Sequence, residues 1–272
     1  MKQKEDKEIL KKSNQDRVVC IIQARMGSSR LPGKVMKDIC GQPMIQWVVS
    51  RALQSEIIDH VLIATTESKS DDTIAAFCQK NGIDCFRGNE FDVLDRYYQA
   101  AKSAEANIIV RLTGDCPLVD AQLIDATIQK MADSSADFCA NRLPPPYKRT
   151  FPIGLDVEVV TMRALETAWH KAIKKYEREH VLPYVYDPQN GFKISILDSV
   201  EDFGEMRWTV DTKEDLEFVR RVMEYLSCKI TFTWLDVLTV VKEHPDLEKI
   251  NEDIAHKTFR DVDSRIGKKE DS

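Results

Sequence analysis

The chain has 272 residues, of which 43% are hydrophobic, and a formal net charge of −6. This length and composition can bury a substantial core, and the acidic balance gives no general attraction to nucleic acid or to an anionic membrane surface. No apolar run reaches the roughly 18 to 20 residues of a membrane span, and the first residues lack the apolar stretch of a signal peptide. We therefore expect a cytoplasmic protein whose partner is a small molecule, with no nucleic acid and no membrane.

The seven cysteines are scattered along the chain without a C-x-x-C pair. Several lie inside apolar runs, where a free thiol behaves as a small hydrophobic side chain. The pattern predicts that the cysteines are reduced, in agreement with a cytoplasmic location.

Strands and helices alternate along the chain. Apolar runs predict strands at 18–22, 60–65, 83–86, 107–112, 136–140, 154–160, 192–197 and 206–210. Helical spacing of apolar residues predicts helices at 43–53, 70–81, 92–104, 120–131, 162–174, 176–184, 213–226 and 233–242. Alternation at this spacing predicts an α/β fold, with a mostly parallel doubly wound sheet and a small C-terminal helical appendage. Ligands bind at the carboxyl ends of the strands in such sheets.

The first strand runs directly into a loop that suits phosphate groups. The loop combines two glycines, two serines and three cations, namely Gly27, Gly33, Ser28, Ser29, Arg25, Arg30 and Lys34. Glycines let backbone N–H groups turn inward, while the hydroxyls and cations add donors and charge. The loop is not a Walker A motif, because five residues separate its glycines and Val35 stands where a Ser or Thr follows the lysine. It also lacks the G-x-G-x-x-G of a dinucleotide site.

Two aspartates follow predicted strands at this edge. Asp115 comes after the strand 107–112, and Asp211 comes after the strand 206–210. Because parallel strand ends of the same sense meet at one edge, the two carboxylates are candidate magnesium ligands. The alternative for Asp115 is a turn aspartate that accepts from loop amides. The alternative for Asp211 is assistance to the start of the helix at 213–226.

Further charged residues fall in the second half of the chain. A proline-rich basic loop holds Arg142, Lys148 and Arg149, which either face an acidic ligand or form an ordinary solvated connection. Asp156 and Glu158 are two residues apart on a predicted strand and so share a face. They can hold a sugar hydroxyl or a cation, or they can face solvent or pair with the basic residues.

Six segments, in this order, resemble the cytidylyltransferases that make CMP-activated acidic sugars, such as the acylneuraminate and 3-deoxyoctulosonate enzymes. The segments are Gln23–Lys34, Gly41–Met44, Arg111–Leu118, Gly154–Val159, Glu177–Val181 and Arg207–Thr212. The resemblance is closest to the spore coat polysaccharide biosynthesis F-type branch. It implies a Rossmann-like nucleotide-diphospho-sugar transferase fold, similar to GT-A. It also implies transfer of CMP from CTP to an acidic sugar, with release of pyrophosphate, use of Mg²⁺, assembly as a homodimer and a role in polysaccharide biosynthesis.

The resemblance also implies roles for individual residues. The expected catalytic residues are Arg25, Arg30, Lys34 and Asp115, and the expected metal ligands are Asp115 and Asp211. The expected nucleotide contacts are Gln23, Ala24, Arg25, Gly27, Ser28, Ser29, Arg30, Lys34, Arg87, Arg111 and Asp115, and Arg87 and a further candidate, Arg96, are of second rank. The expected acceptor contacts are Arg142, Lys148, Asp156, Glu158, Glu177, Arg178 and His180, although a lone histidine is more often a structural hydrogen-bonding residue. We expect a flexible charged tail at 1–16, a cytidylyltransferase-like domain at 17–231, and a helical extension and tail at 232–272.

One departure leaves the accepting sugar open. Cys116 and Pro117 follow Gly114-Asp115, whereas the octulosonate enzymes carry an acidic residue and a proline there. Two other functions stay open as well. A metal-dependent glycosyltransferase typically has a D-x-D motif, and none occurs at Asp115; a catalytically silent scaffold has no need of Lys34 together with both aspartates.

Overall fold

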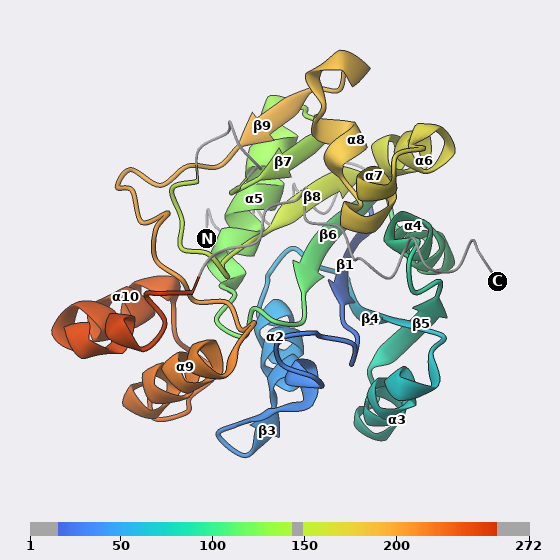
Figure 1. The fold of residues 1–272 in the computed structure, drawn as a ribbon. Helices are drawn as coiled ribbons and strands as arrows, with labels where there is room; N and C mark the ends of the chain where they lie inside the picture. Colours follow the sequence, from blue (N-terminus) through green and yellow to red (C-terminus); the bar gives the residue numbers. More distant parts are fainter. Residues whose placement is uncertain (1–15, 143–148, 255–272) are drawn as a thin grey trace, which may run out of the picture.

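The structure is a computed structural model that describes residues 16–142 and 149–254 (Figure 1). Its centre is a seven-stranded sheet in the order β5-β4-β1-β6-β8-β7-β9. The strands are β1 (Val18–Gln23), β4 (His60–Thr66), β5 (Asp84–Gly88), β6 (Ile108–Thr113), β7 (Phe138–Ala140), β8 (Glu158–Thr161) and β9 (Ile194–Ile196). Only β8 is antiparallel to its neighbours, and the other pairings are parallel. The prediction of a mostly parallel α/β sheet is confirmed.

Helices cover both faces of the sheet (Figure 1). One face carries α4 (Val93–Ser103), α6 (Met162–Lys171), α7 (Lys175–His180) and α8 (Pro183–Tyr186), and the other carries α2 (Met44–Ala52), α3 (Asp72–Asn81) and α5 (Ala121–Ser134). Successive residues of β1 alternate between the two layers: Val19 and Ile21 pack on the first side, and Cys20 and Ile22 on the second. A strand buried on both faces must be apolar throughout, which explains the continuous apolar run.

A third apolar cluster lies beside the sheet. It contains residues of α9 (Lys213–Tyr225), α10 (Trp234–Glu243) and the 3₁₀ helix η4 (Pro245–Ile250), together with Leu31 and Trp47 from the first quarter of the chain. Both α9 and α10 begin with capping boxes, formed by Thr212 with Asp215 and by Thr233 with Asp236. The extension thus shares its core with the segment after β1. The domain division expected at residue 231 stays a prediction.

Several element boundaries differ from those expected. Residues 206–210 form no strand and make only an isolated bridge between Ile153 and Arg207. The strand expected at 154–160 begins only at Glu158. Gly154 has φ 109°, which is outside the strand region, and the Asn141 side chain hydrogen-bonds to the Leu155 carbonyl oxygen and the Val157 N–H. The helix expected at 70–81 begins at Asp72, because the residues before it form the 3₁₀ turn η2 (Lys69–Asp71).

The two predicted helices between residues 162 and 184 are also reorganised. The first ends at Lys171, three residues early. The second is divided into α7 and α8, because Val181 has φ 73° and Pro183 follows it, and neither conformation continues a helix. The short elements η1 (Lys34–Met36), β2 (Asp38–Ile39), β3 (Gln42–Pro43) and η3 (Pro188–Asn190) were not predicted.

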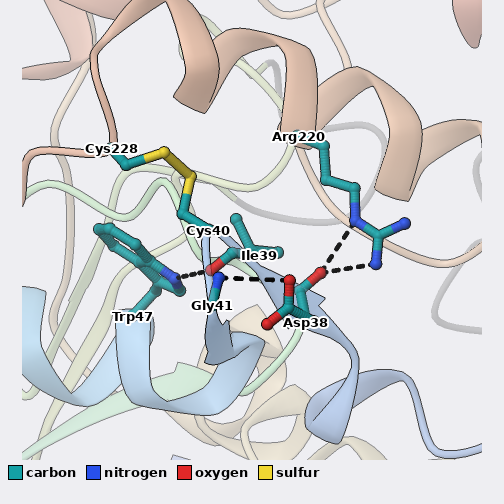
Figure 2. The surroundings of a disulfide bond; sticks show 7 residues. All are labelled: Asp38, Ile39, Cys40, Gly41, Trp47, Arg220 and Cys228. Carbon is teal, nitrogen blue, oxygen red and sulfur yellow. Dashed lines mark hydrogen bonds between the residues drawn. A yellow bond between two sulfur atoms is a disulfide. The ribbon is translucent and has the colours of Figure 1, made fainter.

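A disulfide joins Cys40 to Cys228, 188 residues apart in sequence (Figure 2). The prediction that the cysteines are reduced is wrong for this pair, whereas Cys20, Cys78, Cys85, Cys116 and Cys139 are free. Cys40 lies at the tip of the β2–β3 hairpin. Arg220 of α9 donates to the Asp38 carbonyl oxygen at 2.9 and 2.7 Å, and Trp47 donates to the Ile39 carbonyl oxygen at 2.9 Å. The Arg220 contact holds the hairpin against α9, after which Cys228 follows, and the Trp47 contact holds it against α2.

Within the two described ranges, no helix is both long enough and apolar enough to cross a membrane.

Candidate active site

The loop after β1 is fixed by its own backbone. The N–H groups of Ser28 and Gly33 both donate to the Met26 carbonyl oxygen at 3.0 Å. Gly33 has φ 67°, a conformation that favours glycine, and a Cβ there would be 3.1 Å from the Met26 side chain. The buried carboxylate of Asp71 accepts from the Met26 N–H at 2.8 Å. The loop is therefore shaped before any ligand arrives.

The same loop leaves donors available. The backbone N–H groups of Gly27, Ser29 and Arg30 donate to no backbone oxygen of residues 16–142 or 149–254. The side chain of Arg25 lies beside this stretch, with a guanidinium nitrogen 3.9 Å from Glu90. Backbone amides without a backbone partner, next to cations, are a combination that can bind an anion such as a phosphate group.

Lys34 is the point at which three parts of the chain meet. Its ammonium nitrogen lies 2.6 Å from Asp115 Oδ2 and 2.8 Å from Asp211 Oδ1, and it donates to the Val210 carbonyl oxygen at 3.0 Å. Thr113 orients the first carboxylate by donating to Asp115 Oδ1 at 2.5 Å. The structure thus brings the two aspartates to one place, although 96 residues separate them and Asp211 does not end a strand.

The electrostatics of this junction favour the charged forms. Burial on its own lowers the pKa of Lys34, but the charges and hydrogen bonds of Asp115 and Asp211 outweigh it and raise the pKa above its usual value. Burial likewise acts to raise the pKa of Asp211, but Lys34, Arg30 and Arg207 lower it well below its usual range. Arg30 and Arg207 each approach Asp211 Oδ2 at 2.9 Å. The junction is a network of compensated charges.

The donor set fits a magnesium ion that is shared with phosphates. Among the described residues, no group of three or more His, Cys, Asp or Glu side chains forms a metal site. Two carboxylates do converge at Lys34. Mg²⁺ prefers oxygen ligands and is usually held by one or two carboxylates together with substrate phosphates and water. Two carboxylates, together with phosphate oxygens and water, match this ligand set.

A second network of charged residues connects β1 to the basic loop. Arg111 on β6 pairs with the buried carboxylate of Glu158, its register partner on β8, and also donates to Gln23 Oε1 at 3.2 Å. Arg142 lies 3.6 Å from Glu158 and 3.8 Å from Asp156. Arg149 donates to both oxygens of Asp156. Asp156 and Glu158 therefore pair with basic residues, which was one of the two alternatives left open.

Other expected contacts lie apart from these two networks. Arg87 supports the loop after β4, where it donates to the carbonyl oxygens of Thr66 and Ser68 at 2.9 and 3.0 Å. Arg178 on α7 binds the carboxylate of Asp92 at the start of α4, with a shortest contact of 2.6 Å. Glu177 caps α7, and His180 ends it. Lys148 lies outside the described residues.

Sequence reasoning missed part of the site. Neither Asp71 nor Asp215 was singled out as a site residue. Arg207 was quoted as part of a motif without a role of its own. Arg96 was ranked low, yet it is fully buried, and burial lowers its pKa to about 10. The sequence signal for a buried Arg96 was its position, as a charged residue, within the apolar stripe of a helix.

Comparison with known proteins places these residues in a family. The family described as Cytidylyltransferase matches residues 19–254. An uncharacterized protein of Methanocaldococcus jannaschii is 33% identical over 249 residues, which are 91% of this chain and 99% of that relative. The spore coat polysaccharide biosynthesis protein SpsF of Bacillus subtilis is 33% identical over 236 residues, which are 84% of this chain and 95% of that protein.

Solved structures agree. A cytidylyltransferase from Leptospira borgpetersenii is 34% identical, with a TM-score of 0.82, and the match covers 89% of this chain and all of that one. A CMP:2-keto-3-deoxy-manno-octonic acid synthetase complexed with CTP is 23% identical, with a TM-score of 0.59 over 78% of this chain, and so shows the fold alone. The match over most of the chain shows that this protein belongs to the cytidylyltransferase family.

Proposed function

We propose that the protein transfers CMP from CTP to an acidic sugar or a related acid and releases pyrophosphate. The observation that carries the proposal is the junction at Lys34, where the phosphate loop meets the carboxylates of Asp115 and Asp211. Nucleotidyl transfer needs positioning and charge compensation rather than a covalent intermediate on the protein. A cationic loop beside two carboxylates supplies both.

The chemistry assigns a task to each part of the loop. An acceptor hydroxyl oxygen attacks the α-phosphorus of CTP and gives up its proton to water, the bond to the bridging oxygen breaks, and pyrophosphate leaves with that electron pair. Arg25, Arg30 and Lys34 hold the β- and γ-phosphates and compensate the charge of the leaving group, while Gly27, Ser28 and Ser29 form the cradle. When bound by Asp115 and Asp211, Mg²⁺ neutralises charge on the phosphate oxygens. The nucleotide site is bordered by Gln23, Ala24, Arg87 and Arg111.

The proposed acceptor carries a carboxylate group, and the second charge network contains guanidinium groups that can bind a carboxylate. Arg142 and Arg149 are neutralised by Asp156 and Glu158 in this structure. A carboxylate on the substrate can replace Asp156 as the partner of the Arg142 and Arg149 guanidinium groups. Glu158 stays paired with Arg111 in this exchange. The acceptor contacts expected from the resemblance at Lys148, Glu177, Arg178 and His180 stay predictions. We further propose a cytoplasmic homodimer that acts in surface polysaccharide biosynthesis.

Pyrophosphate release from each of the four nucleoside triphosphates tests the proposal, with Mg²⁺ and a panel of acidic sugars and sugar phosphates. We expect release only with CTP and an acidic acceptor. Release with every nucleotide would overturn the cytidine assignment. Consumption of a nucleotide sugar instead of CTP would indicate a glycosyltransferase.

A further inference from the structure

Asp211 is also held by a residue outside the phosphate loop, Arg207. One guanidinium nitrogen of Arg207 lies 2.9 Å from Asp211 Oδ2 and 2.9 Å from Asp215 Oδ2. The Nε atom of Arg207 donates to Asp215 Oδ1 at 2.8 Å. Arg207 therefore bridges the two carboxylates, so that the position of Asp211 depends on the position of Asp215.

Asp215 is a fully buried carboxylate with several donors. Besides Arg207, it accepts from the backbone N–H groups of Asp211 at 2.9 Å and Thr212 at 3.0 Å. A fifth donor, Asn251 Nδ2, lies 3.0 Å from Asp215 Oδ1. Because Asp215 contacts both the backbone of Asp211 and the arginine that binds its side chain, a shift of Asp215 moves Asp211 through two routes.

Asn251 lies in the C-terminal extension, just after η4. Its side-chain nitrogen donates to Asp215 Oδ1 and, at 3.1 Å, to the Arg207 carbonyl oxygen. The residue is only 5% exposed, so water does not readily replace these hydrogen bonds. Removal of the amide leaves a buried carboxylate with one donor fewer, which is costly in a low-dielectric interior.

We infer that Asn251 is a positioning residue for the Asp211 carboxylate, acting through Asp215 and Arg207, and that the C-terminal extension thereby completes the nucleotide–metal site. The inference rests on the proposed function, because it takes Asp211 as a ligand of the metal–nucleotide complex. An anchor that only fastened η4 to α9 would need no contact with Arg207. Asn251 instead contacts both partners that fix Asp211.

The test compares Asn251→Ala with Leu247→Ala in the full-length protein. Leu247 lies in η4 and is 6% exposed in the third apolar cluster, so its truncation loosens the same extension without removing a hydrogen bond of the network. Binding of Mn²⁺ to the enzyme–CTP complex is measured by electron paramagnetic resonance well below the melting temperature of each variant. Turnover is measured against Mg²⁺ concentration in parallel.

We expect Asn251→Ala to weaken Mn²⁺ binding by about tenfold, the usual effect of removing a group that orients a metal ligand. The Mg²⁺ requirement should rise in proportion. Leu247→Ala should lower the melting temperature and leave Mn²⁺ affinity within about twofold of wild type. If Asn251→Ala does not fold, Asn251→Leu keeps nearly the same shape without the donor and should give the same weakening.

Unchanged Mn²⁺ affinity in the Asn251 variant, or equal losses in both variants, would overturn the inference. Absence of Mn²⁺ binding to the wild-type complex with CTP would instead overturn the proposed function, and the inference with it.

Discussion

Loss of the Cys40–Cys228 disulfide should destabilise the protein without disabling it. The bond closes a loop of 188 residues, for which the chain-entropy relation gives about 5 kcal/mol of stabilisation at 25 °C. This is an upper value, because denatured chains retain some structure and are already restricted. We therefore expect Cys40→Ser to lower the free energy of unfolding by about 2 to 5 kcal/mol.

The assay is guanidinium unfolding of wild type and Cys40→Ser, each with and without a thiol reductant. Only the wild type should lose stability on reduction, and the two proteins should then unfold alike, which provides an internal control. The Arg220–Asp38 and Trp47–Ile39 hydrogen bonds remain, so we expect turnover of CTP to stay within about twofold. Equal unfolding free energies for the two proteins without reductant would refute the reasoning.

Other consequences follow from the junction at Lys34. Lys34→Ala should reduce kcat/KM by at least tenfold, about 1.4 kcal/mol, because compensation of the leaving-group charge is lost; unchanged kinetics would remove Lys34 from the phosphate site. Asp211→Asn and Asp115→Asn should each raise the Mg²⁺ requirement for turnover, since a neutral amide replaces a charged oxygen on a hard cation. Asparagine caps a helix about as well as aspartate. Wild-type Mg²⁺ dependence in Asp211→Asn would therefore leave Asp211 only a capping role. The Asp211 pKa is lowered from 3.8, so the stability that this carboxylate contributes is present above pH 3.8 and is lost as the pH falls through its lower folded-state pKa. The Lys34 pKa is raised from 10.5, so its contribution is present below pH 10.5 and is lost only at more alkaline pH. Unfolding free energies measured from pH 3 to 9 should show the wild-type advantage over Asp211→Asn constant near neutrality and shrinking in acid; an advantage that vanished near pH 7 would contradict this assignment. CTP with Mg²⁺ should raise the melting temperature more than ATP or GTP does, by ligand linkage, and equal shifts would contradict selection of cytosine.

The parallel sheet could be predicted because its signals are local. The central strands β1, β4 and β6 are mostly apolar runs, and capping residues such as Asp120 and Thr212 mark where helices begin. Once the strands are parallel, their carboxyl ends share an edge, so Lys34 and Asp115 could be expected to face one region.

The remaining features depend on contacts between segments far apart in sequence. Strand β8 is antiparallel to both β6 and β7, and the residues of β8 by themselves do not indicate this direction. Cys40 and Cys228 become neighbours only because α9 packs against the β2–β3 hairpin. Asn251 reaches Asp215 only after α10 and η4 have turned the chain back. An isolated asparagine in a polar stretch gives no such signal.

Transfer of the CMP group itself is the most direct test of the proposed reaction. The protein is incubated with Mg²⁺, each acidic acceptor and CTP labelled at the α-phosphorus. The products are separated by chromatography and identified by mass spectrometry. The account predicts that the label moves into a CMP-linked acid in equal amount to the pyrophosphate released, and that Lys34→Ala slows both at least tenfold. Label that stays in CTP, or that appears only as free CMP or CDP with every acceptor, would contradict it.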